Sequence, residues 1–334
     1  LPGHPNRVCN LISENIVDYY QTKDSSSKID IICTLKNNLS IINGTIECKE
    51  HTDTAEIVKN NLTFLGYTSD TKFFNSNSIR HINFSDDLIK SEKSPSYCTY
   101  GFACNESPDL LPNSYYISQN LSNTLFNHLG IKSGIIQTRE KSNAQELITL
   151  LQIENYKNKE LIKVIYDDLL DECEVKGNLF IDFYEDLSPD SILGNNAPEC
   201  NSNFTNISPM LISLAGKSHN DLLKLGTLYC RNISKHIVRS NFASKCLVSV
   251  CWDIDQQKVM SLDINCFDTN LVKIDWLKSL VLDVFPVKIK QIKKEFNLNE
   301  VKWADVSLNG YYGNPTAEIY PWETLNKLKY FVPL

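Results

Sequence analysis

Short apolar runs bounded by turn-forming residues most constrain the fold of this chain. They recur along the 334 residues, and none approaches the ~18 consecutive apolar residues of a membrane-spanning helix. Short apolar runs are typical of β-strands. They occupy residues 29–35, 39–48, 179–184, 210–215, 246–251 and 259–267. Apolar residues with helical spacing fill 11–20, 142–173, 219–238, 271–284 and 289–296. The pattern predicts an α+β fold.

The chain divides near residue 112. Before it, a hairpin of 29–35 and 39–48 is expected, followed by a loop over 91–112, which contains three prolines. After it, a right-handed βαβ unit is expected around the helix at 219–238, and a last strand over 301–308. We therefore expect a β-rich N-terminal region with short hairpins over 1–112. A helical segment plus a mixed α/β domain follows over 113–334.

Composition excludes several classes of protein. Apolar residues make up 42% and charged residues 22% of the chain, which is ordinary for a globular protein and excludes extended disorder. The formal net charge is −7 and no basic run is present, so we expect neither a nucleic-acid partner nor an anionic membrane surface.

The eleven cysteines are too few for a disulfide-dense miniprotein and too many for an ordinary reduced chain. We therefore expect a disulfide-stapled fold, and no metal site, because no CxxC pair is present. No cofactor is expected either. Strand proximity and short separation predict that Cys33 pairs with Cys48, Cys98 with Cys104, and Cys251 with Cys266. The odd cysteine is left free or bonds another chain.

Asn-x-Ser/Thr triplets give a second indication of an oxidising compartment. We expect glycans on Asn38, Asn43, Asn61, Asn83, Asn120, Asn203 and Asn232. Asn105 and Asn206 are expected to remain bare, because proline follows each triplet. The chain begins with Leu1 instead of methionine, which is typical of a mature protein whose signal peptide has been removed. These features predict a secreted or lumenal protein.

Acidic residues and a histidine follow three of the apolar runs. If those strands were parallel, Asp182, Glu185, His219 and Asp253 would converge at one sheet edge. Two carboxyl groups with a histidine could then act as acid and base in glycoside hydrolysis. The alternative is that these residues only form turns and helix caps. The sequence contains no GxSxG, GxGxxG, Walker or HExxH motif.

The function predicted from these features is binding. We expect an extracellular effector, surface component or receptor-type ectodomain that recognises a protein or a glycan, and that is not an enzyme. The alternative is a secreted hydrolase acting on glycans through the four strand-end residues.

Overall fold

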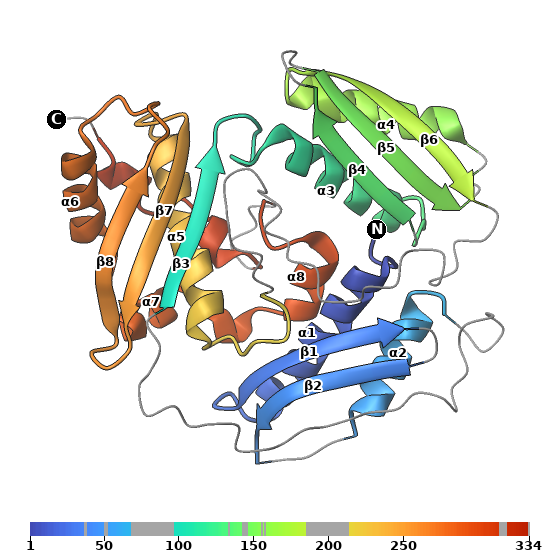
Figure 1. Cartoon of the computed structure of the whole chain (residues 1–334), viewed down its shortest axis with the longest axis horizontal. Coiled ribbons are helices and arrows are strands. Elements are labelled where there is room, and N and C mark those ends of the chain that lie inside the picture. Colours follow the sequence, from blue (N-terminus) through green and yellow to red (C-terminus); the bar gives the residue numbers. More distant parts are fainter. Residues whose placement is uncertain are drawn as a thin grey trace.

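The structure, a computed structural model, describes residues 1–36, 39–49, 53–67, 97–132, 134–141, 146–154, 156, 158–184, 214–313 and 319–332. In this described part of the chain, three separate β-sheets surround a centre made of helices (Figure 1). The predicted mixed α+β class is therefore confirmed.

The first sheet is the predicted hairpin. It joins β1 (Lys28–Lys36) and β2 (Leu39–Glu47), which run antiparallel with Ile31 opposite Gly44. Helix α1 (Pro5–Lys23) covers its inner face, and α2 (Thr54–Phe64) packs against α1. Helix α1 begins at proline, and the His4 side chain caps it by accepting the Asn6 N–H.

The second sheet has the order β4-β5-β6. Strand β4 (Gly134–Glu140) runs antiparallel to β5 (Glu146–Glu154), and β6 (Lys176–Tyr184) runs parallel to β5 after the crossover helix α4 (Lys159–Glu172). Helix α3 (Asn113–Asn127) contacts both β4 and α4. The prediction of helices throughout 142–173 is wrong at β5. There, alternate residues Leu147, Leu151 and Ile153 are buried on one strand face.

The third sheet has the order β3-β7-β8, and all its strands are antiparallel. It consists of β3 (Tyr97–Cys104), β7 (Lys245–Asp253) and β8 (Lys258–Asn265), with α5 (Leu222–Arg239) packed on its inner face. The expected loop over 91–112 is thus wrong at β3, whereas the predicted strands at 246–251 and 259–267 are confirmed and pair antiparallel. The expected partner strand at 210–215 lies mostly outside the described residues, and its last two residues, Leu214 and Ala215, are not in a strand. Strand β7 lies between β3 and β8 and has no parallel neighbour in this sheet. The expected division at residue 112 crosses this sheet, because β3 lies before it.

The C-terminal segment adds α6 (Ile274–Val284), α7 (Ile289–Phe296) and α8 (Trp303–Asn309), with 3-10 turns at Leu298–Glu300, Pro321–Glu323 and Leu328–Tyr330. The predicted strand over 301–308 is wrong. Trp303, Val306 and Ser307 are buried together, and this spacing of three and four residues is that of a helix face.

The first helix packs against the C-terminal segment, since α1 contacts α8 (Figure 1). The Arg7 guanidinium donates to the carbonyls of Ser307 and Leu308, each at 2.9 Å. Asp18 accepts the N–H groups of Trp303 and Ala304, so a carboxylate of α1 caps the N-terminus of α8. Within the described part of the chain, no helix combines the length and the apolar character needed to cross a bilayer.

Candidate functional site

A buried charged network lies where α1, α5 and α8 meet. Lys224 of α5 donates to both carboxylate oxygens of Glu14 in α1, at 2.9 and 3.1 Å, and both side chains are fully buried. The Tyr311 hydroxyl donates to the same carboxylate. The Lys224 ammonium also lies 3.7 Å from the ring centroid of Trp303, a cation–π contact.

Burial controls the ionisation of this network. It raises the pKa of Glu14, although Lys224 and Tyr311 oppose the shift, and it lowers the pKa of Lys224 against the attraction of Glu14. Burial also raises the pKa of Asp18, one turn further along α1. Glu14 and Lys224 therefore have their binding partners within the protein. The network joins the helices α1, α5 and α8.

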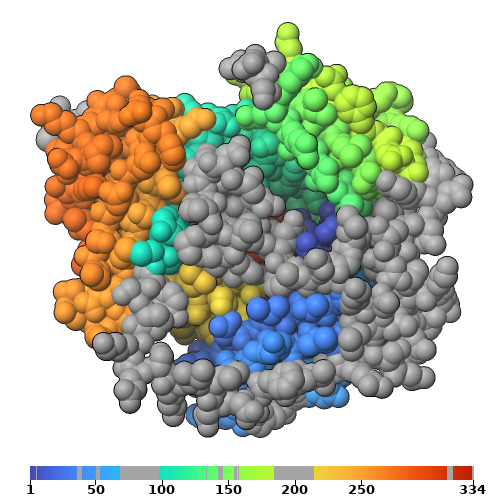
Figure 2. Space-filling view, viewed as in Figure 1, coloured from blue at the N-terminus to red at the C-terminus, as the bar shows by residue number. Residues whose placement is uncertain are grey.

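A second group of polar side chains lies beside this network and is partly open to solvent. Lys217 pairs with Asp30 of β1 at 2.7 Å, with side chains 17% and 60% exposed. The backbone carbonyl of Lys217 accepts from the Lys224 ammonium at 3.0 Å, which connects the two groups. Ser218 holds the segment to β1 by accepting the Ile29 N–H at 2.6 Å. In Figure 2, the N-terminal surface and the surface of the residues that precede and begin α5 adjoin on one face.

His219 completes this group, which we call the Lys217 group (Asp30, Lys217 and His219). The His219 ring is 3% exposed and contacts the Asn220 amide at 2.7 Å. Burial, together with Lys224 and Lys293, lowers the pKa of His219 to about 4. The ring is therefore neutral at pH 7, and the accessible positive charge of the group is that of Lys217.

A third cluster joins α5 to the C-terminal segment. Arg231 donates from Nε and Nη2 to the Glu323 carboxylate at 2.9 and 3.0 Å, and Lys235 donates to it at 2.7 Å. These two cations hold the pKa of Glu323 below its usual range despite complete burial. All three side chains are at most 3% exposed, so the cluster is structural.

The structure does not bring the four predicted catalytic residues together. Asp182 is exposed on β6, in a different sheet from β7, where Asp253 ends the strand and accepts the Gln256 N–H. His219 precedes α5, and Glu185 lies outside the described residues. Convergence required parallel neighbouring strands, and β7 has only antiparallel ones. Among the described residues, no group of three His, Cys, Asp or Glu side chains is arranged to hold a metal.

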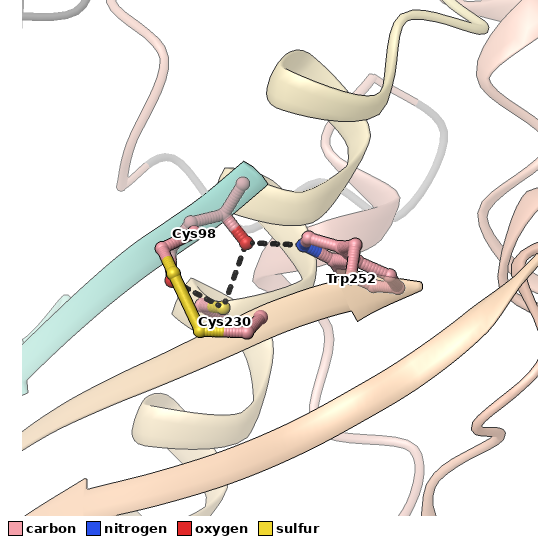
Figure 3. Close-up of a disulfide and its surroundings, with 5 residues drawn as sticks. Cys98, Cys230 and Trp252 are labelled. Atoms are coloured by element: carbon pink, nitrogen blue, oxygen red, sulfur yellow. Dashed lines mark hydrogen bonds between the residues drawn. A yellow bond between two sulfur atoms is a disulfide. The ribbon is translucent and has the colours of Figure 1, made fainter. Parts of the chain in front are cut away.

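The structure has a disulfide bond that differs from each of the predicted cysteine pairs. Cys98 of β3 bonds Cys251 of β7, directly opposite in the ladder with Cα atoms 4.3 Å apart (Figure 3). The predicted Cys98–Cys104 and Cys251–Cys266 bonds are therefore wrong, and Cys104 and Cys266 are free thiols. Cys33 and Cys48 are also free, because Ile42 and not Cys48 lies opposite Cys33, whose thiol contacts Cys9.

The predicted glycan acceptors differ widely in exposure. Asn232 is 1% exposed and donates to the carbonyls of Trp322 and Thr324, so the fold leaves no room for a glycan there. Asn61 is 8% exposed and donates to Ile57. Asn43 is exposed and Asn120 is half-buried. Asn38, Asn83 and Asn203 lie outside the described residues.

The three-sheet α+β architecture and both ends of the sequence match one known class of protein. Residues 1–87 match the S-adenosylmethionine synthetase N-terminal domain, and residues 211–324 match the C-terminal domain of the same enzyme family. Together these matches span more than half of the chain.

Whole-length comparisons agree with the domain matches. An S-adenosylmethionine synthase of Mycoplasmopsis synoviae (strain 53) is 27% identical, covering 98% of this chain and 94% of that protein. The synthase of Trichodesmium erythraeum (strain IMS101) is 21% identical, covering 98% and 93%. An S-adenosylmethionine synthetase structure from Campylobacter jejuni, described as unusual, superposes with a TM-score of 0.80 at 20% identity, covering 99% and 96%. The chain is an S-adenosylmethionine synthetase-like protein.

These findings overturn the function predicted from the sequence. The expectation of a secreted, signal-peptide-processed glycoprotein that binds a protein or glycan is wrong, and so is the alternative of a glycan hydrolase. The domains and relatives indicate an enzyme of the methionine adenosyltransferase class. The sequence-based prediction also missed Glu14 and Asp18, two carboxylates one helical turn apart among apolar residues of the predicted helix over 11–20.

Proposed function

We propose that this chain is an S-adenosylmethionine synthase, which transfers the adenosyl group of ATP to the sulfur of methionine. The observation that carries the proposal is the match of both terminal domains to one enzyme family, within a fold that superposes over almost the whole chain. The relatives that it resembles over 98% of its length carry the same name.

The chemistry defines what the protein must supply. The methionine sulfur is a neutral thioether with a free lone pair, so its attack on C5′ of the nucleotide requires no general base. As the C–S bond forms and the C5′–O bond breaks, positive charge develops on sulfur and the leaving polyphosphate keeps its negative charge. The protein therefore acts by aligning the two reactants and by placing fixed charges beside them.

The Lys217 group offers charges of the required signs. Lys217 is a partly exposed cation that can bind polyphosphate oxygens, and Asp30 is an exposed carboxylate next to it. Glu14 and Lys224 bind each other and instead hold the carbonyl of Lys217 in place. We therefore assign Lys217 to polyphosphate binding, with the buried network as its support.

The test is direct synthesis. The purified full chain is incubated with methionine and magnesium ATP, and S-adenosylmethionine is quantified by mass spectrometry. Lys217→Met should lower kcat/KM by about 10²-fold, the effect typical of removing one charge-stabilising donor. The matched control is Lys28→Met, on the strand β1 that also carries Asp30, because Lys28 pairs with Glu47 with both side chains largely exposed. That variant should retain wild-type activity.

The outcomes separate the function from the site. If wild-type protein with a cooperative unfolding transition forms no S-adenosylmethionine, the proposed function is wrong. If Lys217→Met is as active as Lys28→Met, the function stands and the assignment of Lys217 is wrong.

A further inference from the structure

A pair of free thiols lies at one end of the β7–β8 ladder. The last paired residues are Leu247 and Asn265, and one further step along the same antiparallel register places Cys246 opposite Cys266. Directly opposed residues of antiparallel strands have Cα atoms about 4.5–5.5 Å apart, within the range that a disulfide spans. Cys98 and Cys251 have the same opposed relation in the neighbouring ladder and are bonded.

The two thiols already interact with each other. A hydrogen bond from Cys246 lowers the pKa of Cys266, while burial and the same interaction raise the pKa of Cys246. The proton is thus retained on Cys246, and Cys266 is the thiol that becomes a thiolate more readily. A thiolate is the reactive form of cysteine toward oxidants. By contrast, Cys230 of α5 contacts Thr99, and burial raises its pKa to about 12.

The backbone after Cys266 gives the pair a route to reagents. Cys246 and Cys266 are only 0% and 2% exposed. Phe267 and Asp268, which follow directly, have φ values of 53° and 59°, the left-handed region that residues other than glycine rarely adopt. Phe267 is 39% exposed. This strained turn at the surface is the segment whose opening would uncover Cys266.

We propose that Cys246 and Cys266 form a redox modification site, at which a peroxide converts the dithiol into a disulfide. The Cys266 thiol releases its proton, the thiolate attacks one peroxide oxygen, and the O–O bond breaks to give a sulfenic acid and hydroxide, which takes up the released proton as water. The Cys246 sulfur then attacks the Cys266 sulfur, the S–S bond forms, the S–O bond breaks, and the hydroxyl leaves with the Cys246 proton as a second water. The two thiols lose two electrons to the peroxide.

Oxidation would connect β7 covalently to both of its neighbours, to β3 through Cys251 and to β8 through Cys246. The inference depends on strand register and thiol chemistry, and is independent of the proposed synthase activity.

Peptide mapping tests the proposal on the full chain. Native protein is treated with hydrogen peroxide, denatured with N-ethylmaleimide, digested with trypsin and analysed without reduction. Cys246 and Cys251 share the tryptic peptide 246–258, Cys266 lies in 259–273, and Cys98 lies in 94–132. The expected product is a single species that joins all three peptides and separates on reduction. Peptide 225–231, which contains Cys230, is the internal control and should be fully alkylated.

Two variants assign the bonds within that species. Cys251→Ser should leave 246–258 joined only to 259–273, which identifies Cys246 as the partner of Cys266. Cys266→Ser should leave 246–258 joined only to 94–132. The proposal is overturned if 259–273 remains fully alkylated after peroxide treatment, or if Cys266 is found bonded to another peptide or another chain. The wild-type digest alone decides this, should a variant fail to fold.

Discussion

Single residues in the buried network carry a large share of the stability. Lys224→Met removes the cation that compensates Glu14, and both side chains are fully buried. Leaving one member of such a pair uncompensated costs about 3–5 kcal/mol, whereas exposed pairs contribute about 1 kcal/mol or less. We expect Lys224→Met to lower the free energy of unfolding in urea by that larger amount. Lys28→Met, in the exposed pair with Glu47, should lower it by less than about 1 kcal/mol. Equal losses would show that the network is not stabilising.

His236 makes stability depend on pH. Its Nε2 accepts the Lys327 N–H and its Nδ1 faces the Asn232 carbonyl, so the neutral ring satisfies both partners. Burial lowers its pKa from 6.5 to about 4. Between these values the unfolded chain binds a proton that the folded chain does not. Stability is therefore retained above pH 6.5 and falls as the pH decreases toward 4, by up to about 1.4 kcal/mol per pH unit for this one group.

His236→Gln isolates that contribution, because an amide can donate to Asn232 and accept from Lys327 without titrating. Denaturant unfolding at a series of pH values should show a shallower loss for the variant between pH 6.5 and 4. Parallel curves for the variant and the wild type would assign the acid sensitivity to other groups.

At the scale of elements, glycines allow α5 to approach the third sheet closely. A Cβ atom on Gly101 of β3 would lie 2.0 Å from the backbone nitrogen of Arg231, and one on Gly226 of α5 would lie 2.7 Å from the Thr99 side chain. Gly101→Ala must therefore push α5 away from β3. We expect it to destabilise the protein by about 1–3 kcal/mol or more.

Gly130→Ala is the matched control for thermal unfolding. Nothing lies within 4 Å of its added Cβ, although its φ of 68° makes the substitution mildly unfavourable. Gly101→Ala should lower the unfolding temperature clearly more than Gly130→Ala does. Similar shifts for the two variants would mean that α5 and β3 tolerate separation.

The elements that were predicted correctly have sequence patterns that fit only one kind of secondary structure. The β1–β2 hairpin alternates around a polar turn, and α5 has an aspartate cap followed by a long amphipathic face. Strand β5 and helix α8 were assigned wrongly because their short apolar patterns fit both periods. Their packing partners, β6 for β5 and α1 for α8, decide between strand and helix.

The candidate site was harder to predict because its members are far apart in sequence. Glu14 and Lys224 are separated by 210 positions, and no local pattern relates them. His219 was singled out for its place before α5, and it does lie beside Lys217. The strand-end carboxylates Asp182 and Asp253 were expected to converge, but strand direction places them in different sheets.

At the scale of the whole molecule, the N-terminal region depends on the C-terminal one. Helix α1 packs on α8, Arg7 and Asp18 bind the backbone of α8, and Glu14 binds Lys224. We expect a fragment of residues 1–67 to remain largely unfolded, because it would expose this face of α1 and leave Glu14 without its cation. Circular dichroism and the dispersion of amide NMR resonances would measure this. A fragment that unfolds cooperatively would contradict the prediction.

The arrangement of α1 and α8 also has a consequence for biosynthesis. A ribosome releases α1 first, when the lysine that neutralises Glu14 is still about two hundred codons away and α8 nearly three hundred. The inner face of α1 therefore stays accessible to chaperones until Lys224 and α8 have been synthesised. Only then can α8 pack against α1, so the rate of translation limits when the native state can first form.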